Sequence, residues 1–366
     1  MRVLIIKLKH IGDSLLLTPT IDAIKAMDPS SEIWVLVREG CQEILAGCVS
    51  IDRLLTSAPP KKGDRTLADR LAGLRLATTL LTHRFDYVFE LSDGDRGRWL
   101  ATFARTRNRC TNGGVRPISR GWSRVFNGIA ECNWLGMHAV EKDFRTVGEF
   151  LPLGEAPPAM RFDPSRTKPW ETEADLSDFA FLHTATRWER KEWPADNWIK
   201  LAERLLQRVS RLVLSCGPEE REIANTRRLA EQLGDRAIFT EGKLEWSQIA
   251  WLLQRARLFV GVDTAAMHLA AACNCPTVAI FGPSVPWVWR PWRVPSEVAA
   301  PEDHLTYLGV YDQFNQVAAL KTADGPVSRV WEACQRFLDG GRQTRAAGPG
   351  SDSDQTDEDH RLNIRV

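Results

Sequence analysis

The sequence predicts an α/β protein with two domains, each a parallel sheet flanked by helices. At 366 residues the chain is long enough for two separate cores. Apolar strand-length segments alternate with helix-length segments in both halves, which is typical of parallel βαβ units. Between the two alternating regions, residues 150–178 gather proline, glycine and charge. We therefore expect two Rossmann-like domains facing across a cleft, at residues 1–165 and 170–340.

The first half begins with a strand almost at the first residue. Apolar runs predict strands over 3–8, 32–37 and 86–91, and helical patterns predict helices over 14–27 and 67–82. Residues 59–64, rich in proline and lysine, predict a loop. The opening apolar stretch is too short and too interrupted by lysine for a signal peptide. No apolar run approaches the ~20 residues needed to span a bilayer.

The second half repeats the alternation. Its predicted strands are 179–183, 211–215, 237–240, 258–262 and 277–281. Helices are expected between them, including one starting near Pro194 and one over 246–254, and a last amphipathic helix is expected over 327–338. Residues 341–366 are poor in apolar side chains and predict a disordered tail.

Charge and cysteine content limit the function classes. The formal net charge of +1 argues against a nucleic-acid binder that works by bulk charge, although residues 1–150 hold 22 Lys and Arg against 17 Asp and Glu. The eight cysteines form no C-x-x-C pair, which fits reduced thiols in a cytoplasmic protein. Cys273 and Cys275 form a C-x-C without supporting histidine spacing, so we expect no metal site.

The most informative segment is 258–284, which reads as strand, turn, helix and strand. Asp263 and Thr264 lie where the first strand gives way to a helix of small residues. Unpaired N–H groups at a helix start favour a phosphate, and small side chains let one approach. His268, four residues after Thr264, shares its helix face and is either part of this site or a packed residue. The segment predicts a diphosphate site.

Three further polar turns follow predicted strands of the second half. In 183–198, Arg187, Arg190 and Lys191 either neutralise a diphosphate or belong to a solvated loop. Glu219 and Glu220 either bind ribose hydroxyls or supply favourable charge in a first helical turn. Gly242 to Leu244 precede another helix. Together the four turns at one sheet edge predict a nucleotide pocket.

Two features of the first half carry chemistry. Gly12-Asp13 follows the first strand, where Asp13 is either a helix N-cap, with Ser14 as a substitute, or a carboxylate able to take a proton from a hydroxyl. Residues 96–124 contain eight arginines, two tryptophans and no acid. This stretch is either a surface for an anionic, membrane-seated substrate or a solvated basic face; RNA binding lacks any RRM or KH signature.

Taken together, these residues resemble the heptosyltransferases of lipopolysaccharide core synthesis, glycosyltransferase family 9, over roughly residues 1–340. The resemblance is strongest in VLIIKLKHIGDSLLLTPTIDAIK, TRWERKEWPADNWIKLAERL and GVDTAAMHLAAACNCPTVAIFGPS. The K-x-K-H-I-G-D opening and the R-W-x-x-K-x-W-P loop look most like the third heptosyltransferase, which adds the side-branch heptose.

The resemblance implies a GT-B fold and an inverting transfer of heptose from ADP-heptose to a sugar hydroxyl of the lipopolysaccharide inner core. It implies no metal and no cofactor besides the donor substrate, and a cytoplasmic enzyme peripheral to the inner membrane. No nucleic-acid partner is expected. The alternatives are a related enzyme using another nucleotide sugar and a non-catalytic sugar-nucleotide-binding protein.

The resemblance also assigns site residues. Asp13 matches the catalytic base, and Lys191 matches a lysine that contacts the donor phosphates. Ala265 stands where the family has glycine; alanine keeps an N–H but adopts positive φ less freely. The implied donor-binding set is Thr186, Arg187, Lys191, Glu219 or Glu220, Leu244, Asp263, Thr264, Ala265 and His268. The candidate acceptor-binding residues are Lys7, Arg96, Arg98 and Arg120.

Overall fold

The computed structural model describes residues 1–58, 66–115, 117–300 and 326–340. The chain divides into two compact units, Met1–Arg166 and Thr167–Val366. The division falls within 150–178, next to the short 3-10 helix η3 (Pro164–Arg166). The predicted loop at 59–64 and the predicted disordered tail lie outside the described residues.

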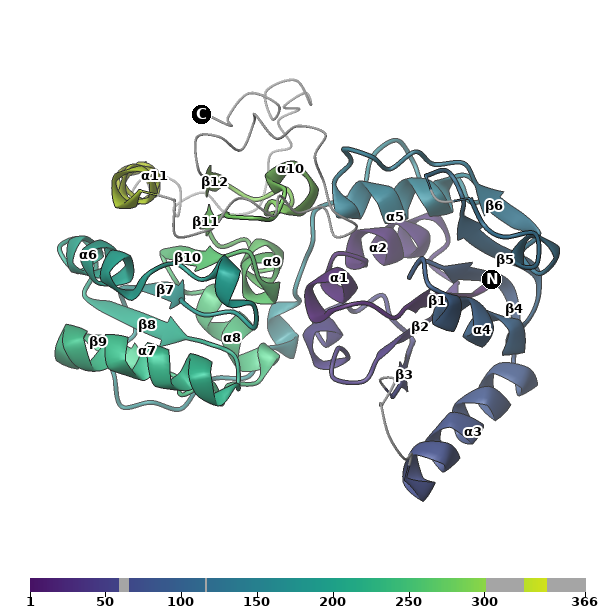
Figure 1. The fold of residues 1–366 in the computed structure, drawn as a ribbon, viewed down its shortest axis with the longest axis horizontal. Helices are drawn as coiled ribbons and strands as arrows, with labels where there is room; N and C mark the ends of the chain where they lie inside the picture. The colour runs from purple at the N-terminus through teal and green to yellow at the C-terminus, as the bar shows by residue number, and fades with distance from the viewer. Residues whose placement is uncertain (59–65, 116, 301–325, 341–366) are drawn as a thin grey trace. The chain divides into compact units, whose positions relative to one another are not determined.

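The first unit contains a six-stranded parallel sheet with the order β3-β2-β1-β4-β5-β6 (Figure 1). The strands are β1 (Arg2–Lys7), β2 (Glu32–Arg38), β3 (Arg53–Ser57), β4 (Arg84–Glu90), β5 (Arg105–Asn112) and β6 (Gly128–Ala130). The helices are α1 (Ile11–Leu15), α2 (Thr18–Met27), η1 (Glu43–Leu45), α3 (Leu67–Thr82), α4 (Asp95–Phe103), η2 (Trp122–Arg124) and α5 (Ala139–Gly148). The strand order reverses between β1 and β4, so their carboxyl ends form the edge where open α/β sheets bind ligands.

The second unit repeats this topology, with the strand order β12-β11-β10-β7-β8-β9. Its strands are β7 (Phe179–His183), β8 (Arg211–Ser215), β9 (Ala237–Phe239), β10 (Leu258–Val262), β11 (Thr277–Ile280) and β12 (Ser296–Ala299). Its helices are η4 (Glu189–Lys191), α6 (Ala195–Leu205), α7 (Glu220–Leu233), η5 (Gly234–Arg236), α8 (Trp246–Leu253), α9 (Ala265–Ala272), α10 (Pro286–Trp289) and α11 (Val327–Gly340). Here the order reverses between β7 and β10, which places the expected ligand edge at their carboxyl ends.

The two parallel-sheet units confirm the predicted α/β fold class. The helix expected over 14–27 was wrong, because the segment forms two helices, α1 and α2. Pro19 lies in the first turn of α2, where its missing N–H costs nothing, and it could not stand in the interior of one longer helix.

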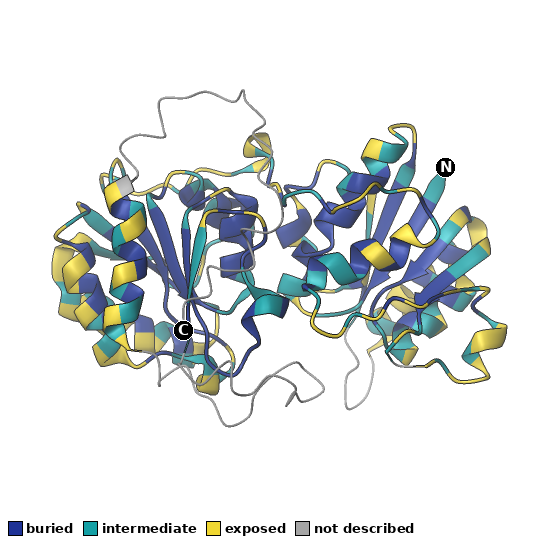
Figure 2. Cartoon of the chain, turned by 90° about the horizontal axis from the view of Figure 1, so that it is seen from above, coloured by how far each residue is buried: buried dark blue, intermediate teal, exposed yellow. Residues whose placement is uncertain are grey.

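Each sheet is buried between layers of helices. Along β1 and β2 nearly every side chain is buried, and Figure 2 shows both sheets dark beneath helices whose outer faces are exposed. In the second unit the core includes two tryptophans, Trp193 and Trp198, packed edge to face with ring centroids 5.1 Å apart. This packing fixes the start of α6 and therefore the loop that precedes it.

Candidate functional site

The start of α9 combines an unpaired hydroxyl with the N–H groups of a helix terminus. Thr264 is the N-cap residue in extended conformation, with φ −146° and ψ 173°. Its Oγ1 is buried and has no hydrogen-bond partner in the described part of the chain. A buried hydroxyl without a partner is costly, and an anionic oxygen at the helix start would satisfy it. The Thr264 hydroxyl and the first N–H groups of α9, from which the sequence predicted a phosphate site, therefore lie together at this helix start.

An ion pair ties the preceding loop to this helix start. Lys191, the last residue of η4, donates to Asp263 with Nζ 2.6 Å from Oδ2. Both side chains are largely buried. Burial alone would raise the pKa of Asp263, but the charges of Lys191 and His268 outweigh it and lower that pKa. Asp263 is therefore a carboxylate, and it holds the Lys191 ammonium beside Thr264.

Ala265 and His268 occupy the first and second turns of α9. Ala265 is the first helical residue and has negative φ, so the conformation found here makes no demand for glycine. His268 is buried one turn further on, consistent with its effect on the Asp263 carboxylate. Asp263 and His268 therefore lie close enough to interact, with the N-cap residue Thr264 between them in the chain.

A second network, which the sequence did not indicate, holds the loop of residues 186–192. Arg221, in the first turn of α7, donates to Glu192 Oε1 at 2.7 Å and to the Thr186 carbonyl at 2.8 Å. Glu192 Oε1 also accepts from the Thr186 N–H at 3.3 Å. Arg221 and Glu192 are 29 residues apart, and no local pattern reveals the pairing. The network closes the loop that carries Arg187 and Lys191.

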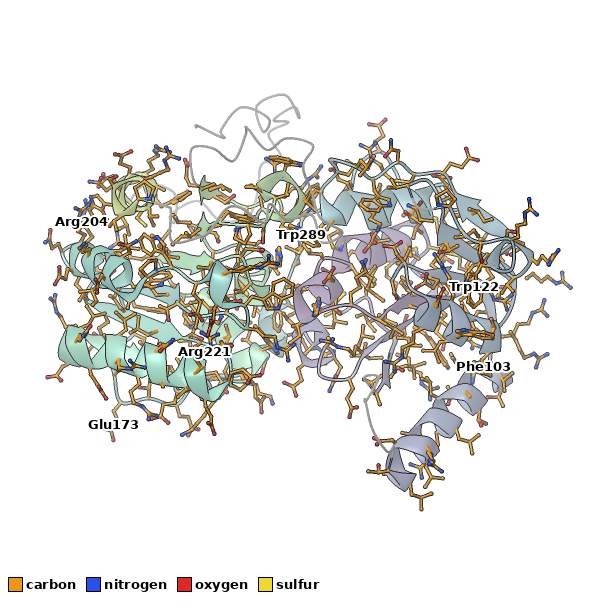
Figure 3. The ribbon with its side chains drawn as sticks, in the orientation of Figure 1. Phe103, Trp122, Glu173, Arg204, Arg221 and Trp289 are labelled. Atoms are coloured by element: carbon orange, nitrogen blue, oxygen red, sulfur yellow. The ribbon has the colours of Figure 1, made fainter. Side chains whose placement is uncertain are left out.

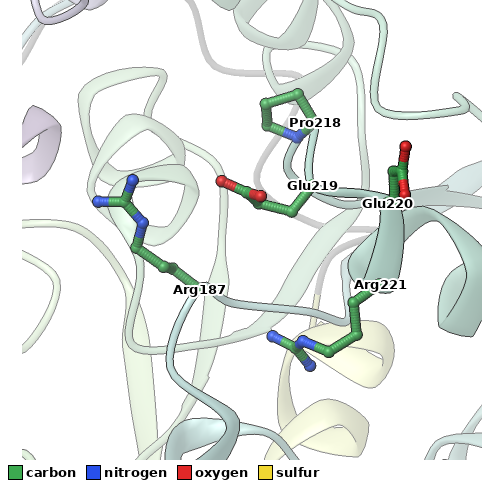
Figure 4. A pocket seen from close by; sticks show the side chains of 5 residues that line it. All are labelled: Arg187, Pro218, Glu219, Glu220 and Arg221. Atoms are coloured by element: carbon green, nitrogen blue, oxygen red, sulfur yellow. The ribbon is translucent and has the colours of Figure 1, made fainter.

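An open pocket of about 650 Å³ lies beside this network (Figure 4). It is lined by Arg187, Pro218, Glu219, Glu220 and Arg221. Glu219 is the N-cap residue of α7, and its side chain points toward Arg187 in Figure 4, whereas that of Glu220 lies further from Arg187 and does not point toward it. The exposed guanidinium of Arg187 therefore faces one of the two candidate ribose-binding acids.

The turns after β8 and β9 are packed against each other through two glycines. Gly242 has φ +65°, and a Cβ there would lie 2.6 Å from the Gly217 carbonyl oxygen. Gly217 donates its N–H to the buried Glu222 at 2.9 Å, and burial raises the pKa of Glu222. Glu222 was not singled out from the sequence. The contact brings Leu244, which is half-buried, near the turn that starts α7.

In the first unit, Asp13 lies in α1 at the carboxyl end of β1. Of the two alternatives for Asp13, the one that makes Asp13 or Ser14 the N-cap is wrong, because His10 holds that position. Asp13 is the third helical residue, and its Oδ2 accepts from the His10 N–H at 3.2 Å. The Asp13 side chain is half-buried.

Lys7, the last residue of β1, is buried and contacts both carboxylate oxygens of Asp143 on α5, at 2.7 and 2.8 Å. Burial alone favours the neutral amine, but Asp143, Asp13 and Asp93 outweigh it and raise the pKa of Lys7. Lys142 pairs with Asp93 nearby. Asp13 therefore lies near a buried cation.

The three candidate acceptor arginines differ in placement. Arg96 and Arg98 lie in the first turns of α4, which follows the carboxyl end of β4, so they share the sheet edge of Asp13. Arg96 donates to Ser57 Oγ at 2.8 Å and to the Ala58 carbonyl. Arg98 Nη1 lies 3.4 Å from Asp95 Oδ1. The Nε of Arg98 is buried and has no hydrogen-bond partner among the described residues. Arg120 is exposed beyond β5.

The described residues contain neither a metal-type cluster of side chains nor a helix that could span a membrane. Within 1–58, 66–115, 117–300 and 326–340, no three His, Cys, Asp or Glu side chains gather as a metal site would need. In the same ranges no helix has the length and apolar character to cross a bilayer.

Comparison with known proteins decides the family. The profile of glycosyltransferase family 9 (heptosyltransferase) matches residues 73–304. The chain belongs to this family. Among its relatives, lipopolysaccharide heptosyltransferase 3 of Escherichia coli K12 is 27% identical over 294 residues, 78% of this chain and 83% of the relative. Lipopolysaccharide heptosyltransferase 1 of Pseudomonas aeruginosa is 30% identical over 296 residues, covering 78% and 80%.

Solved structures agree on the fold. Heptosyltransferase WaaC of Escherichia coli with ADP superposes with a TM-score of 0.76 at 20% identity, covering 92% of this chain and all of that one. Heptosyltransferase II of Escherichia coli gives 0.69 at 17% identity, covering 93% of this chain and all of that one. This family 9 glycosyltransferase therefore has the GT-B fold that its sequence predicts.

Proposed function

We propose that this family 9 enzyme transfers heptose from ADP-heptose to a sugar hydroxyl of the lipopolysaccharide inner core, at the cytoplasmic face of the inner membrane. Its relatives are named lipopolysaccharide heptosyltransferases, and WaaC structures contain ADP and ADP-2-deoxy-2-fluoro heptose. The observation that carries the proposal is the Lys191–Asp263 pair beside the buried Thr264 hydroxyl at the start of α9, which has no hydrogen-bond partner among the described residues.

In this proposal the donor diphosphate binds at the start of α9. Lys191 and the N–H groups of Ala265 and Ala266 supply positive charge, and Arg187 adds a cation from the neighbouring pocket. Glu219, which points toward Arg187, is the better placed acid for the ribose hydroxyls, and the Gly242–Leu244 turn borders the adenine. These groups compensate the charge of departing ADP, so we assign no step to a metal ion.

The proposed reaction is a single displacement with inversion. The acceptor oxygen attacks the anomeric carbon, its proton passes to Asp13, and the bond from that carbon to the diphosphate oxygen breaks to release ADP. The buried Lys7 cation lies close enough to Asp13 for the two charges to interact. Arg96, Arg98 and Arg120 are proposed to contact anionic groups of the acceptor.

The test is ADP release from ADP-heptose, with and without heptose-deficient lipopolysaccharide core, together with mass analysis of the core. We expect acceptor-dependent release and a core heavier by one heptose. The anomeric configuration of the product, read by NMR, checks the inversion. Tight ADP binding without acceptor-dependent transfer would instead point to another donor sugar or acceptor, and absent ADP binding would contradict the site.

A further inference from the structure

Helix α3 carries leucines on two opposite faces, and only one face is packed. Leu76 and Leu80 are buried and belong to the core of the first unit. Four other leucines of α3 are exposed: Leu67 by 73%, Leu71 by 44%, Leu74 by 64% and Leu81 by 49%. A water-facing helix surface rarely gathers so many large apolar side chains without a partner.

The exposed leucines form one stripe along the helix. At about 100° per residue, positions 67, 71, 74 and 81 lie within roughly 40° of a single line. On the same wheel Leu76 lies about 180° away from that line. We call Leu67, Leu71, Leu74 and Leu81 the leucine stripe. It runs along the whole of α3, which Figure 1 shows as a separate helix at the edge of the first unit.

Cations border the leucine stripe. Arg70 and Arg75, both exposed, lie about 60° and 80° to either side of it. Beyond the C-terminal end of α3, Arg84 and Arg105 are exposed and face each other in register on β4 and β5. Asp69, the one acid within α3, lies on the far side and accepts from the Thr66 N–H at 3.0 Å as part of the helix cap.

The neighbouring helix α4, which packs against α3, adds exposed aromatic side chains. Trp99 is 62% exposed and stacks edge to face with Trp122, with ring centroids 5.2 Å apart. Phe103, at the end of α4, is also exposed; Figure 3 labels it together with Trp122. Amphipathic aromatic rings are favoured at the boundary between lipid and water.

We propose that the leucine stripe of α3 docks this enzyme on an anionic lipid bilayer. The helix would lie parallel to the membrane, with its leucines below the headgroups and its arginines among the lipid phosphates. This deepens the proposed function, because an acceptor anchored in a membrane requires the enzyme to work at its surface. A second copy of the chain is a less suitable partner. If two α3 helices packed with their leucine stripes together, Arg70 and Arg75 of one copy would lie close to the same arginines of the other. No acidic residue on that face of α3 would compensate the repulsion.

The experiment is sedimentation of the full chain with vesicles. One set contains phosphatidylethanolamine with phosphatidylglycerol, and the other phosphatidylcholine alone. We expect binding to the anionic set, weakened at least about tenfold in the double variant Leu67→Gln with Leu74→Gln. The variant Arg70→Gln with Arg75→Gln should lose most of the preference for anionic lipid.

The matched control is Val49→Gln with Leu135→Gln, two exposed apolar side chains of the same unit outside α3. It should bind vesicles as the parent does, and circular dichroism should show all variants folded. The proposal would be overturned if the control and the stripe variants lost vesicle binding equally, or if the parent protein did not bind anionic vesicles. A dimer, seen by analytical ultracentrifugation, that only the stripe variant dissociates would also overturn it. Sedimentation with vesicles does not require catalysis. The membrane-docking proposal can therefore be tested even if the transfer assay fails.

Discussion

Lys191 Nζ and Asp263 Oδ2 lie 2.6 Å apart, and this ion pair joins the loop after β7 to the start of α9. Both side chains are mostly removed from solvent, so each depends on the other to offset its desolvation. The pair also holds a cation at the terminus of a helix whose N-cap hydroxyl lacks a described partner. Lys191 is thus one member of a buried ion pair and, in the proposed function, also a phosphate-binding group, and variants can separate the two roles.

Replacing Lys191 by methionine should damage both roles at once. We expect ADP binding weaker by about 10- to 100-fold, the usual worth of a charge-assisted hydrogen bond. Unfolding free energy should fall by about 3 kcal/mol, because the buried Asp263 carboxylate loses its partner. Calorimetric titration and urea unfolding measure the two effects.

The double variant Lys191→Met with Asp263→Asn separates the roles. It should recover most of the lost stability, since no buried charge is left unpaired, but should not recover ADP affinity. Lys200→Met, at an exposed position of α6, is the control and should change neither quantity. Recovery of ADP affinity in the double variant would show that Lys191 is purely structural.

Arg221 should matter for ADP binding through the loop it holds. The variant Arg221→Ala removes the hydrogen bonds to Glu192 and to the Thr186 carbonyl, so we expect ADP affinity to fall about tenfold as the loop loosens. Glu192→Ala should lower ADP affinity by a similar factor. The double variant should bind ADP only slightly more weakly than either single variant, because each single substitution already breaks the same network. Arg228→Ala, further along α7 at an exposed position, is the control. Fully additive losses would contradict a shared network.

The elements that the sequence predicted best are the ones buried on both faces. The bounds expected for β7, β8 and β10 are those observed, because a central parallel strand is a continuous apolar run between turns. No strand was predicted for β5, where Arg105, Arg107 and Arg109 break any apolar pattern and only the last three of its 8 residues are buried. Hydrophobic periodicity does not reveal such a strand, because the strand forms by pairing with its neighbour in the sheet and not by burying an apolar face of its own.

The site divides in the same way. The turns that carry Asp13 in the first unit and Lys191 and Asp263 in the second could be predicted, because polar residues directly after buried parallel strands gather at the carboxyl edge of their own sheet. The partners of those residues could not. Lys7 pairs with Asp143 across 136 residues, and Arg221 with Glu192 across 29. Such pairings follow from tertiary packing and leave no local signal in the sequence.

Glu90 should make the stability of the protein fall as pH rises. It is fully buried at the end of β4, and burial raises its pKa to about 7. Between its unfolded pKa near 4.5 and this value, the folded state binds the additional proton, so the stabilising contribution is complete below about pH 4.5 and is lost toward pH 7.

The variant Glu90→Gln keeps an acceptor for the Ser92 N–H, which donates to Glu90 at 2.8 Å, and removes the titration. Relative to the parent it should gain roughly 3 kcal/mol of unfolding free energy between pH 4.5 and pH 8. Urea unfolding at the two pH values measures the gain, with the exposed Glu39→Gln as the control. A parent and variant that respond equally to pH would show that Glu90 is not the titrating group.

Asp13 has a structural counterpart that permits a strict test of its chemical role. In α1 the N-cap is His10, and the third helical residue, Asp13, accepts from its N–H at 3.2 Å. In α5 the N-cap is His138, and the third helical residue, Glu141, accepts from its N–H at 3.1 Å. Both carboxylates therefore perform the same capping duty, while Asp13 alone is proposed to take the acceptor proton.

Asp13→Asn should lower kcat for ADP release by about 10²–10⁴-fold, the usual share of general base catalysis, with ADP affinity unchanged. Glu141→Gln should lower the free energy of unfolding by about 1 kcal/mol or less, as Asp13→Asn should, and should leave kcat within about twofold of the parent value. If the two variants lost activity equally, capping would account for Asp13 and the base would lie elsewhere. A rate loss confined to Asp13→Asn, with donor binding intact and the protein folded, is the outcome that only proton transfer explains.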